Sequence, residues 1–221
     1  MIERLNADFS QPAVVRMRDA AWLPSPMPGV ARHMLDRVGG EVARATTIVR
    51  YAAGSKFSAH LHGGGEEFLV LDGVFEDASG VFPAGTYVRN PPGTSHAPST
   101  GPGCLLFVKL HQMDPADRAL LRIDTNIHPW IPRGEGVAVM ALYQGPGERV
   151  ELWELAAGAH IRLPNAAGLE LLVLNGTLGD PRAALAQWDW LRLPAGQELE
   201  RASSTGCRLW VKTGHLAPTP S

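Results

Sequence analysis

Short apolar runs alternate with groups of turn-forming residues along the chain. In the first half these runs cover residues 45–54, 66–75, 85–93 and 104–110, and Gly, Pro, Asp or Asn lie at the breaks between them. Runs of this length that are rich in β-branched and aromatic residues are typical of strands. Several short strands at this spacing predict an all-β sandwich or barrel.

The second half of the chain repeats the first. With a shift of 103 positions, residues 67–109 align with residues 170–212 without a gap and are identical at 14 of 43 positions. Composition alone predicts about three identities, so the alignment indicates an internal duplication. The sequence therefore predicts two tandem domains, at residues 1–112 and 127–221, joined by a linker at 113–126.

The predicted linker holds two competing local patterns. Asp114 and Pro115 fit the start of a short helical turn, whereas the alternation at residues 120–124 fits a strand equally well. The sequence leaves both interpretations open.

Composition narrows the class of protein. Hydrophobic residues make up 45% and charged residues 19% of the 221 residues, which excludes a disordered or polyelectrolyte chain. The 24 Gly and 18 Pro residues favour short strands and turns over long helices. The net charge of −2 provides no basic field, so we expect neither nucleic acid nor an anionic membrane as a partner.

The cysteines and the first residues of the chain bear on its location. Cys104 and Cys207 are too few for a disulfide framework and form no Cys-x-x-Cys pair. Charges at Glu3, Arg4 and Asp8 lie where a secretory signal would be apolar, and no apolar run approaches about 18 residues. We therefore expect a cytoplasmic protein.

One stretch of the first copy has the composition of a metal site. His60 and His62 are two residues apart, so on a strand both imidazoles point to the same face. Gly63 to Gly65 then allow a tight turn that returns a carboxylate beside them, for which Glu66 and Glu67 compete. A fourth ligand is expected from His96, which follows a turn made rigid by prolines.

These residues resemble the two cupin signatures. The first signature is reproduced by Gly54, His60, His62, Glu66 and Gly73, which are separated in turn by five, one, three and six residues. The spacing to Gly73 selects Glu66 as the carboxylate ligand. In the second signature Gly85, Pro91, Gly93 and His96 have the same separations as in the family. Thr100 is the one departure, because the family usually has Asn there. The resemblance implies a duplicated cupin, a double-stranded β-helix or jelly-roll barrel, with metal ligands His60, His62, Glu66 and His96.

Residues 18–112 resemble more narrowly the ChrR-type cupins. That family takes its name from a zinc-binding anti-sigma factor with a helical sigma-binding domain ahead of its cupin. Nothing before Trp22 is long enough for such a domain, and no His-x-x-x-Cys-x-x-Cys motif occurs, so we do not expect a sigma factor as partner. The resemblance supports the cupin part alone.

The second copy lacks the site. Leu169 aligns with Glu66 and Leu199 with His96, while His60 and His62 fall within residues 163–166 according to where a gap is placed. His160 is off the pattern. We therefore expect a degenerate second cupin and one divalent transition-metal ion per chain.

The ligand types leave the metal and the activity open. Three imidazoles and one carboxylate suit Zn, Fe(II), Mn, Ni or Cu, and the resemblance favours zinc. The first hypothesis is a regulatory metal cupin that responds to an oxidant or a small molecule. The second is an Fe(II)-dependent dioxygenase acting on a diketone or hydroxyacetophenone, and isomerase or hydrolase chemistry is a third. A homodimer is also expected as one way to cover the apolar outer face of residues 66–73.

Overall fold

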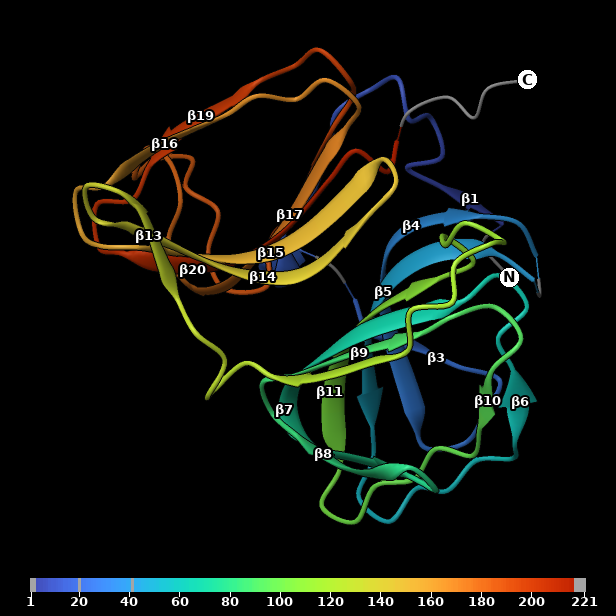
Figure 1. Ribbon diagram of the computed structural model, residues 1–221. Coiled ribbons are helices and arrows are strands. Elements are labelled where there is room, and N and C mark those ends of the chain that lie inside the picture. Colours follow the sequence, from blue (N-terminus) through green and yellow to red (C-terminus); the bar gives the residue numbers. More distant parts are fainter. Residues whose placement is uncertain (1–2, 20, 41, 217–221) are drawn as a thin grey trace. The chain divides into compact units, whose positions relative to one another are not determined.

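The computed structural model describes residues 3–19, 21–40 and 42–216 and divides the chain into two β units (Figure 1). Unit 1 comprises Met1–Ala7 and Ala21–His128, and unit 2 comprises Asp8–Ala20 and Pro129–Ser221. Within the described residues the only helix is a single 3-10 turn, η1, at Met17–Asp19. The predicted all-β class is therefore confirmed, and no described helix is long and apolar enough to cross a membrane.

Unit 1 is built from one large antiparallel sheet and one small one. The strands of the large sheet are β1 (Arg4–Leu5), β3 (Leu23–Pro24), β4 (Val30–Val38), β5 (Arg44–Tyr51), β7 (Glu66–Asp77), β8 (Gly80–Pro83), β9 (Thr86–Asn90), β11 (Cys104–Leu110) and β12 (Leu121–Asp124). Their order is β1-β4-β5-β11-β7-β9-β12, with β3 beside β4 and β8 beside β7. The small sheet pairs β6 (His60–Leu61) with β10 (Ser95–His96).

Unit 2 repeats this arrangement. The strands of its large sheet are β2 (Ala13–Val15), β13 (Ile131–Gly134), β14 (Val137–Gly145), β15 (Glu148–Leu155), β17 (Leu169–Gly176), β18 (Trp190–Leu193) and β20 (Cys207–Thr213). Their order is β13-β14-β15-β20-β17-β18-β2, and a small sheet pairs β16 (His160–Leu163) with β19 (Leu199–Ala202). The central order β4-β5-β11-β7-β9 of unit 1 thus recurs as β14-β15-β20-β17-β18, as the sequence repeat predicts.

The last strand of each large sheet comes from outside the repeated sequence. β12 pairs with β9 in unit 1, and β2 pairs with β18 in unit 2. Residues 121–124 of the predicted linker therefore form a strand of unit 1, and residues 8–20 lie with unit 2 rather than with the first domain. Both added strands satisfy backbone groups that an edge strand would leave unpaired. β2 is too short to give a distinctive pattern, whereas the alternation at residues 120–124 was one of the two interpretations that the sequence left open.

Side chains alternate between the two faces of β7, and this alternation decides what each face buries. Phe68 and Val70 lie in the core of unit 1 together with Leu106 and Val108. Glu67 lies on the opposite face, where it is 2% exposed and opposite Arg89 on β9.

Two side chains bind Glu67 there. Tyr87 Oη donates a hydrogen bond to Glu67 Oε1 at 2.8 Å, and Arg89 Nη1 lies 3.4 Å from Glu67 Oε2. Unit 2 has the same pattern at Glu170, which is opposite Arg192 and accepts a hydrogen bond from Trp190 Nε1 at 2.7 Å. The duplication therefore preserves a buried charged cluster on this face as well as the apolar core.

The repeat also preserves one glycine in each large sheet, Gly73 and Gly176. Gly73 has φ +72° and Gly176 has φ +75°, a left-handed conformation that side chains rarely adopt. A Cβ atom at Gly73 would overlap the carbonyl oxygen of Gly103, and one at Gly176 would overlap that of Gly206. Glycine is thus needed here both for its φ and for the close approach of the neighbouring strand.

A pair of glycine substitutions separates these two causes. Gly73→Ala should lower the free energy of unfolding by about 3 kcal/mol or more, because left-handed strain of about 1–2 kcal/mol adds to overlap with backbone. Gly54→Ala is the matched control, since Gly54 has φ +75° but nothing within 4 Å of an added Cβ. Chemical denaturation of both variants measures the difference. Equal losses would show that the close approach contributes nothing.

Candidate metal centre

Three short elements bring the predicted ligands of unit 1 together. His60 on β6 lies directly opposite His96 on β10 in the small sheet. His62 follows β6, and the glycine turn after it leads to Glu66, the first residue of β7. One donor atom from each of the four residues lies within 4.8 Å of the others. The sequence pattern therefore identified four side chains that converge in space.

The two buried imidazoles direct one nitrogen each toward the Glu66 carboxylate. His62 Nε2 lies 3.4 Å and His96 Nε2 lies 3.3 Å from Glu66 Oε2. Neither Nε2 has a hydrogen-bond partner among the described residues. Buried polar atoms without partners are costly, and a bound cation would remove this cost.

The outer nitrogens of the same rings fix their tautomers. Thr94 Oγ1 donates its proton to the carbonyl of Pro91 at 2.7 Å, so at 2.9 Å it accepts a hydrogen bond from His62 Nδ1. The Asp77 carboxylate accepts from His96 Nδ1 at 3.0 Å. With both Nδ1 atoms protonated, both Nε2 lone pairs point into the centre, as metal-bound histidines require. These residues fit a transition-metal ion.

The structure also separates the two competing glutamates. Glu66 has the same parity along β7 as the core residues Phe68 and Val70, and its Oε2 accepts a hydrogen bond from Asn90 Nδ2 at 3.1 Å. Glu67 points to the other face, into the charged cluster with Arg89 and Tyr87. Among the two, Glu66 alone lies beside the histidines.

Arg122 is a residue of this centre that the sequence did not reveal. Its Nη2 donates to Asn90 Oδ1 at 2.7 Å, so Asn90 links the guanidinium to Glu66. Arg122 lies on β12, in the segment predicted as a linker. The alternation at residues 120–124 was the available signal, because a strand beside β9 carries a side chain to this end of the sheet.

Burial and neighbouring charges shift the pKa values of the cluster. Burial raises the pKa of Glu66 to about 7, against the lowering effect of the Asn90 hydrogen bond and the Arg122 charge. Burial also lowers the pKa of His62 to about 4, reinforced by the positive charges of His96, His60 and Arg122. The pKa of His96 is lowered for the same reasons, burial first and then His60. Neutral imidazoles are the form that binds metal.

Unit 2 has leucines at the corresponding positions. The pair His60 and His96 across the small sheet of unit 1 corresponds to Leu163 and Leu199 across that of unit 2. Leu163, Leu199 and Leu169, which corresponds to Glu66, belong to the apolar core of this unit. His160 lies at the exposed end of β16 and pairs with Glu200 at 3.5 Å.

Comparison with known proteins identifies the family to which the first part of the chain belongs. Residues 10–114 match the family model described as the ChrR cupin-like domain. This part of the chain is therefore a ChrR-type cupin domain, which confirms the resemblance seen in the sequence. No curated protein sequence gives a significant match.

Solved structures confirm the cupin fold over nearly the whole chain. A candidate dioxygenase from Nostoc punctiforme superposes with a TM-score of 0.72 at 13% identity, covering 95% of this chain and 81% of its own. The bacterial pirin YhhW from Escherichia coli, solved with nickel(II), gives 0.68 at 14% identity and covers 95% and 100%. The oxalate decarboxylase of Lactobacillus farciminis, solved with formate, gives 0.65 at 10% identity and covers 95% and 87%. Identities this low establish the fold alone.

The protonation of Glu66 can be measured directly. In protein treated with a chelator, carbon-13 NMR should show one carboxyl that titrates near pH 7, because burial disfavours its ionised form. This titration should disappear in Glu66→Gln and remain in the matched variant Glu76→Gln, which changes a glutamate outside the cluster. A wild-type protein in which every carboxyl is ionised below about pH 6 would contradict the raised pKa.

Proposed function

We propose that unit 1 binds one zinc ion through His60, His62, Glu66 and His96 and that the chain is a regulatory cupin responding to an oxidant or a small molecule. The convergence of four donor atoms within 4.8 Å of one another carries this proposal. Three imidazoles and one carboxylate are ligand types that zinc takes in four-coordinate sites. Oε2 of Glu66 lies 3.3 and 3.4 Å from the Nε2 atoms of His96 and His62, so these three donors can reach one ion.

The surrounding residues would maintain this set. Thr94 and Asp77 hold the imidazoles of His62 and His96 in the binding tautomer, and Asn90 orients Glu66. When bound, the ion supplies a positive charge that offsets the burial of the carboxylate and strengthens contacts between the small and the large sheet. Since Glu66 and His62 lie on separate elements, a change in the coordination shell would alter how these elements are held together.

The regulatory part of the proposal rests on the family. The ChrR cupin-like match covers the part of the chain that contains all four residues. A zinc ion with four protein ligands has no open position, which suits a structural or sensing site better than catalysis. An oxidant or a chelating small molecule would act by replacing one ligand, and His60, the exposed member of the set, is the one within its reach.

Metal content tests the ligand set. Protein purified without added metal should contain about one zinc per chain, and His62→Ala should lose it together with thermal stability, because bound metal stabilises the folded state. His160→Ala, which removes an exposed histidine of unit 2, should retain both. Elemental analysis and thermal melts with and without a chelator give the two readouts. Full occupancy in His62→Ala would rule out these ligands, and two ions per chain would point to a second site.

A second function, an Fe(II)-dependent dioxygenase of diketones or hydroxyacetophenones, is favoured by the exposure of one side of the cluster. His60 is exposed and Leu61 beside it is 68% exposed, so a small molecule can approach from this side. Fe(II) would supply a Lewis acid with open positions for a chelating enolate and for dioxygen. Arg122 would contribute a positive charge behind Glu66, which favours an anionic substrate.

Iron loading distinguishes the two functions. For a dioxygenase, iron-loaded protein should consume one dioxygen per molecule of pentane-2,4-dione, and zinc-loaded protein should consume none. The matched control is His62→Ala with the same iron added. Zinc as the native metal, together with no oxygen uptake above this control, would leave the regulatory function in place.

A further inference from the structure

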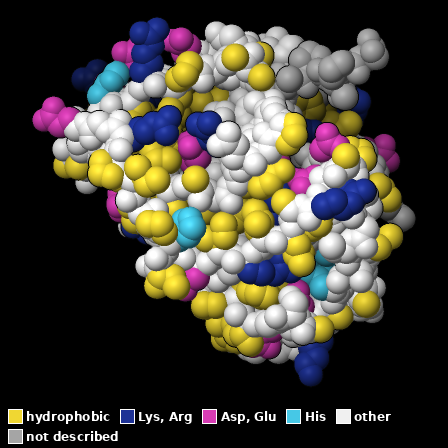
Figure 2. Space-filling model, in the orientation of Figure 1, with side chains coloured by type: hydrophobic (Ala, Val, Ile, Leu, Met, Phe, Trp, Pro, Cys, Tyr) yellow, Lys and Arg dark blue, Asp and Glu magenta, His cyan; other side chains and the backbone are white. Residues whose placement is uncertain are grey.

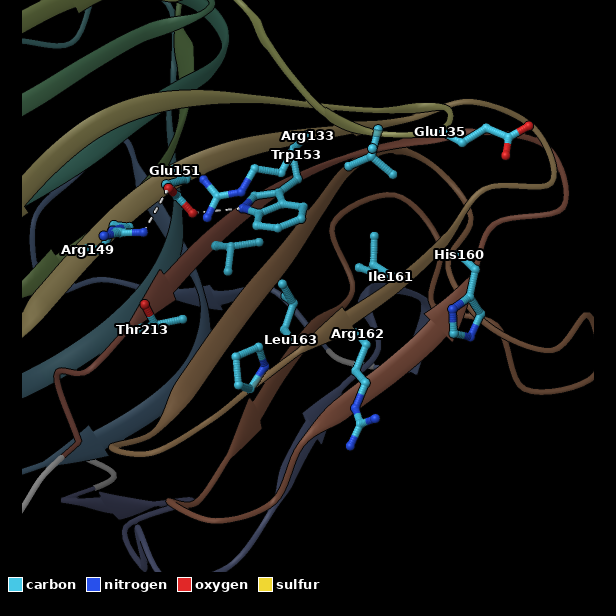
Figure 3. A pocket seen from close by; sticks show the side chains of 14 residues that line it. Arg133, Glu135, Arg149, Glu151, Trp153, His160, Ile161, Arg162, Leu163 and Thr213 are labelled. Atoms are coloured by element: carbon cyan, nitrogen blue, oxygen red, sulfur yellow. Dashed lines mark hydrogen bonds and ion pairs between the residues drawn. The ribbon is translucent and has the colours of Figure 1, made fainter.

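Unit 2 contains a pocket of its own at the mouth of its barrel (Figure 3). Its volume is about 390 Å³, within the range of small-molecule sites. Side chains from β13, β14, β15, β16 and β20 line it, all of them in unit 2. Leu163, which takes the place of His60, is among them, so the pocket opens beside the position that the metal centre has in unit 1.

Three side chains with polar groups in this pocket come from one strand. Arg149, Glu151 and Trp153 alternate along β15 and all line the pocket. Trp153 Nε1 donates to Glu151 Oε2 at 3.0 Å, and Arg149 Nη1 lies 3.7 Å from Glu151 Oε1. The contact with Glu151 therefore involves one guanidinium nitrogen of Arg149 at a long distance. A guanidinium carries five N–H donors, which is more than this contact can use.

Comparison with unit 1 shows that these polar groups are particular to unit 2. Arg149, Glu151 and Trp153 are opposite Thr213, Val211 and Leu209 on β20. At the matching positions of unit 1, Ala45, Thr47 and Val49 lie opposite Leu110, Val108 and Leu106 on β11. The barrel without metal ligands is thus the one with an arginine, a glutamate and a tryptophan at its mouth.

The arginines around the pocket differ in what they already bind. Arg162 is held by Glu198, with its Nη2 at 2.6 Å from the carboxylate. Arg133 is exposed, lines the pocket and makes no ion pair within the described part of the chain. Figure 3 shows Arg133 and Arg149 at one end of the pocket, together with Glu151 and Trp153, and Glu135 and His160 at the other.

We propose that this pocket binds an organic monocarboxylate with an aromatic or branched apolar body. Arg133 and Arg149 would hold the carboxylate, because arginine N–H groups match its geometry. The faces of Trp153, Ile161 and Leu163 would contact the apolar body. Glu135 at the far end would repel a second carboxylate, so dicarboxylates should bind more weakly.

Benzoate is the probe, and calorimetry on the full-length protein measures its affinity. Wild-type protein should bind one benzoate per chain, whereas benzyl alcohol, which has the same ring without the charge, should bind at least about ten-fold more weakly. Arg133→Met and Arg149→Met should each weaken benzoate by about ten-fold. Arg182→Met, an exposed arginine of unit 2 that does not line the pocket, is the matched control and should bind as the wild type does.

Two further measurements make the result decisive. Arg133 is exposed and without an ion pair among the described residues, so Arg133→Met keeps the fold even if Arg149→Met, which leaves Glu151 buried, does not. Wild-type protein that has been treated with a chelator and dialysed should bind benzoate unchanged, because no residue of the metal cluster lines the pocket. Loss of binding after this treatment would assign the carboxylate to the metal centre of unit 1 instead. Unchanged affinity in Arg133→Met, equal binding of benzyl alcohol, or no binding at millimolar benzoate would overturn the proposal.

Discussion

The alternation of side chains at the start of β7 is the constraint on which both the fold and the candidate site depend. Glu66 and Glu67 are neighbours with identical chemistry, yet one faces the histidines and the other faces Arg89. A shift of the strand by one residue would move Phe68 out of the core and exchange the two carboxylates. A glutamate could face Arg89 in the shifted register too, so it is the burial of Phe68 and Val70 that fixes the register and delivers Glu66 to the centre and Glu67 to Arg89.

A comparison of the two repeats shows which buried groups both units keep and which they do not. Both units retain the cluster on the outer face of the large sheet, in which the identical residues are Glu67 and Glu170, Arg89 and Arg192, and Lys109 and Lys212. The centre of the barrel, by contrast, has changed from histidines to Leu163 and Leu199. Buried imidazole nitrogens without partners cost free energy unless a cation binds them, whereas leucines contribute to the core with no ion. The core of unit 2 therefore needs no metal ion to compensate buried imidazoles.

The sequence predicted the features that depend on local pattern. It did not predict which sheet the short edge strands join, because that depends on contacts between distant parts of the chain. The strands, the duplication and the convergence of His60, His62, Glu66 and His96 follow from spacing, since a two-residue separation and a glycine turn have few structural outcomes. The choice of Glu66 over Glu67 came from the family spacing, and the structure supplies its physical reason. Thr100 is the one departure from the signature, and its hydroxyl donates a hydrogen bond to Val74 O and accepts one from Gly103 N. At the matching position of unit 2, the Ser203 hydroxyl donates a hydrogen bond to Thr177 O.

The edge strands explain both the misplaced boundaries and the residue that was missed. β12 and β2 are short segments from outside the repeat, and nothing in three or four residues indicates which sheet they join. Yet β12 carries Arg122, whose contact with Asn90 places a positive charge behind Glu66. In unit 2 the same edge is taken by β2, where Val14 is opposite Leu191. The two barrels thus differ in their centres and also in the strand that completes them, and in unit 1 that strand supplies part of the electrostatics of the candidate site.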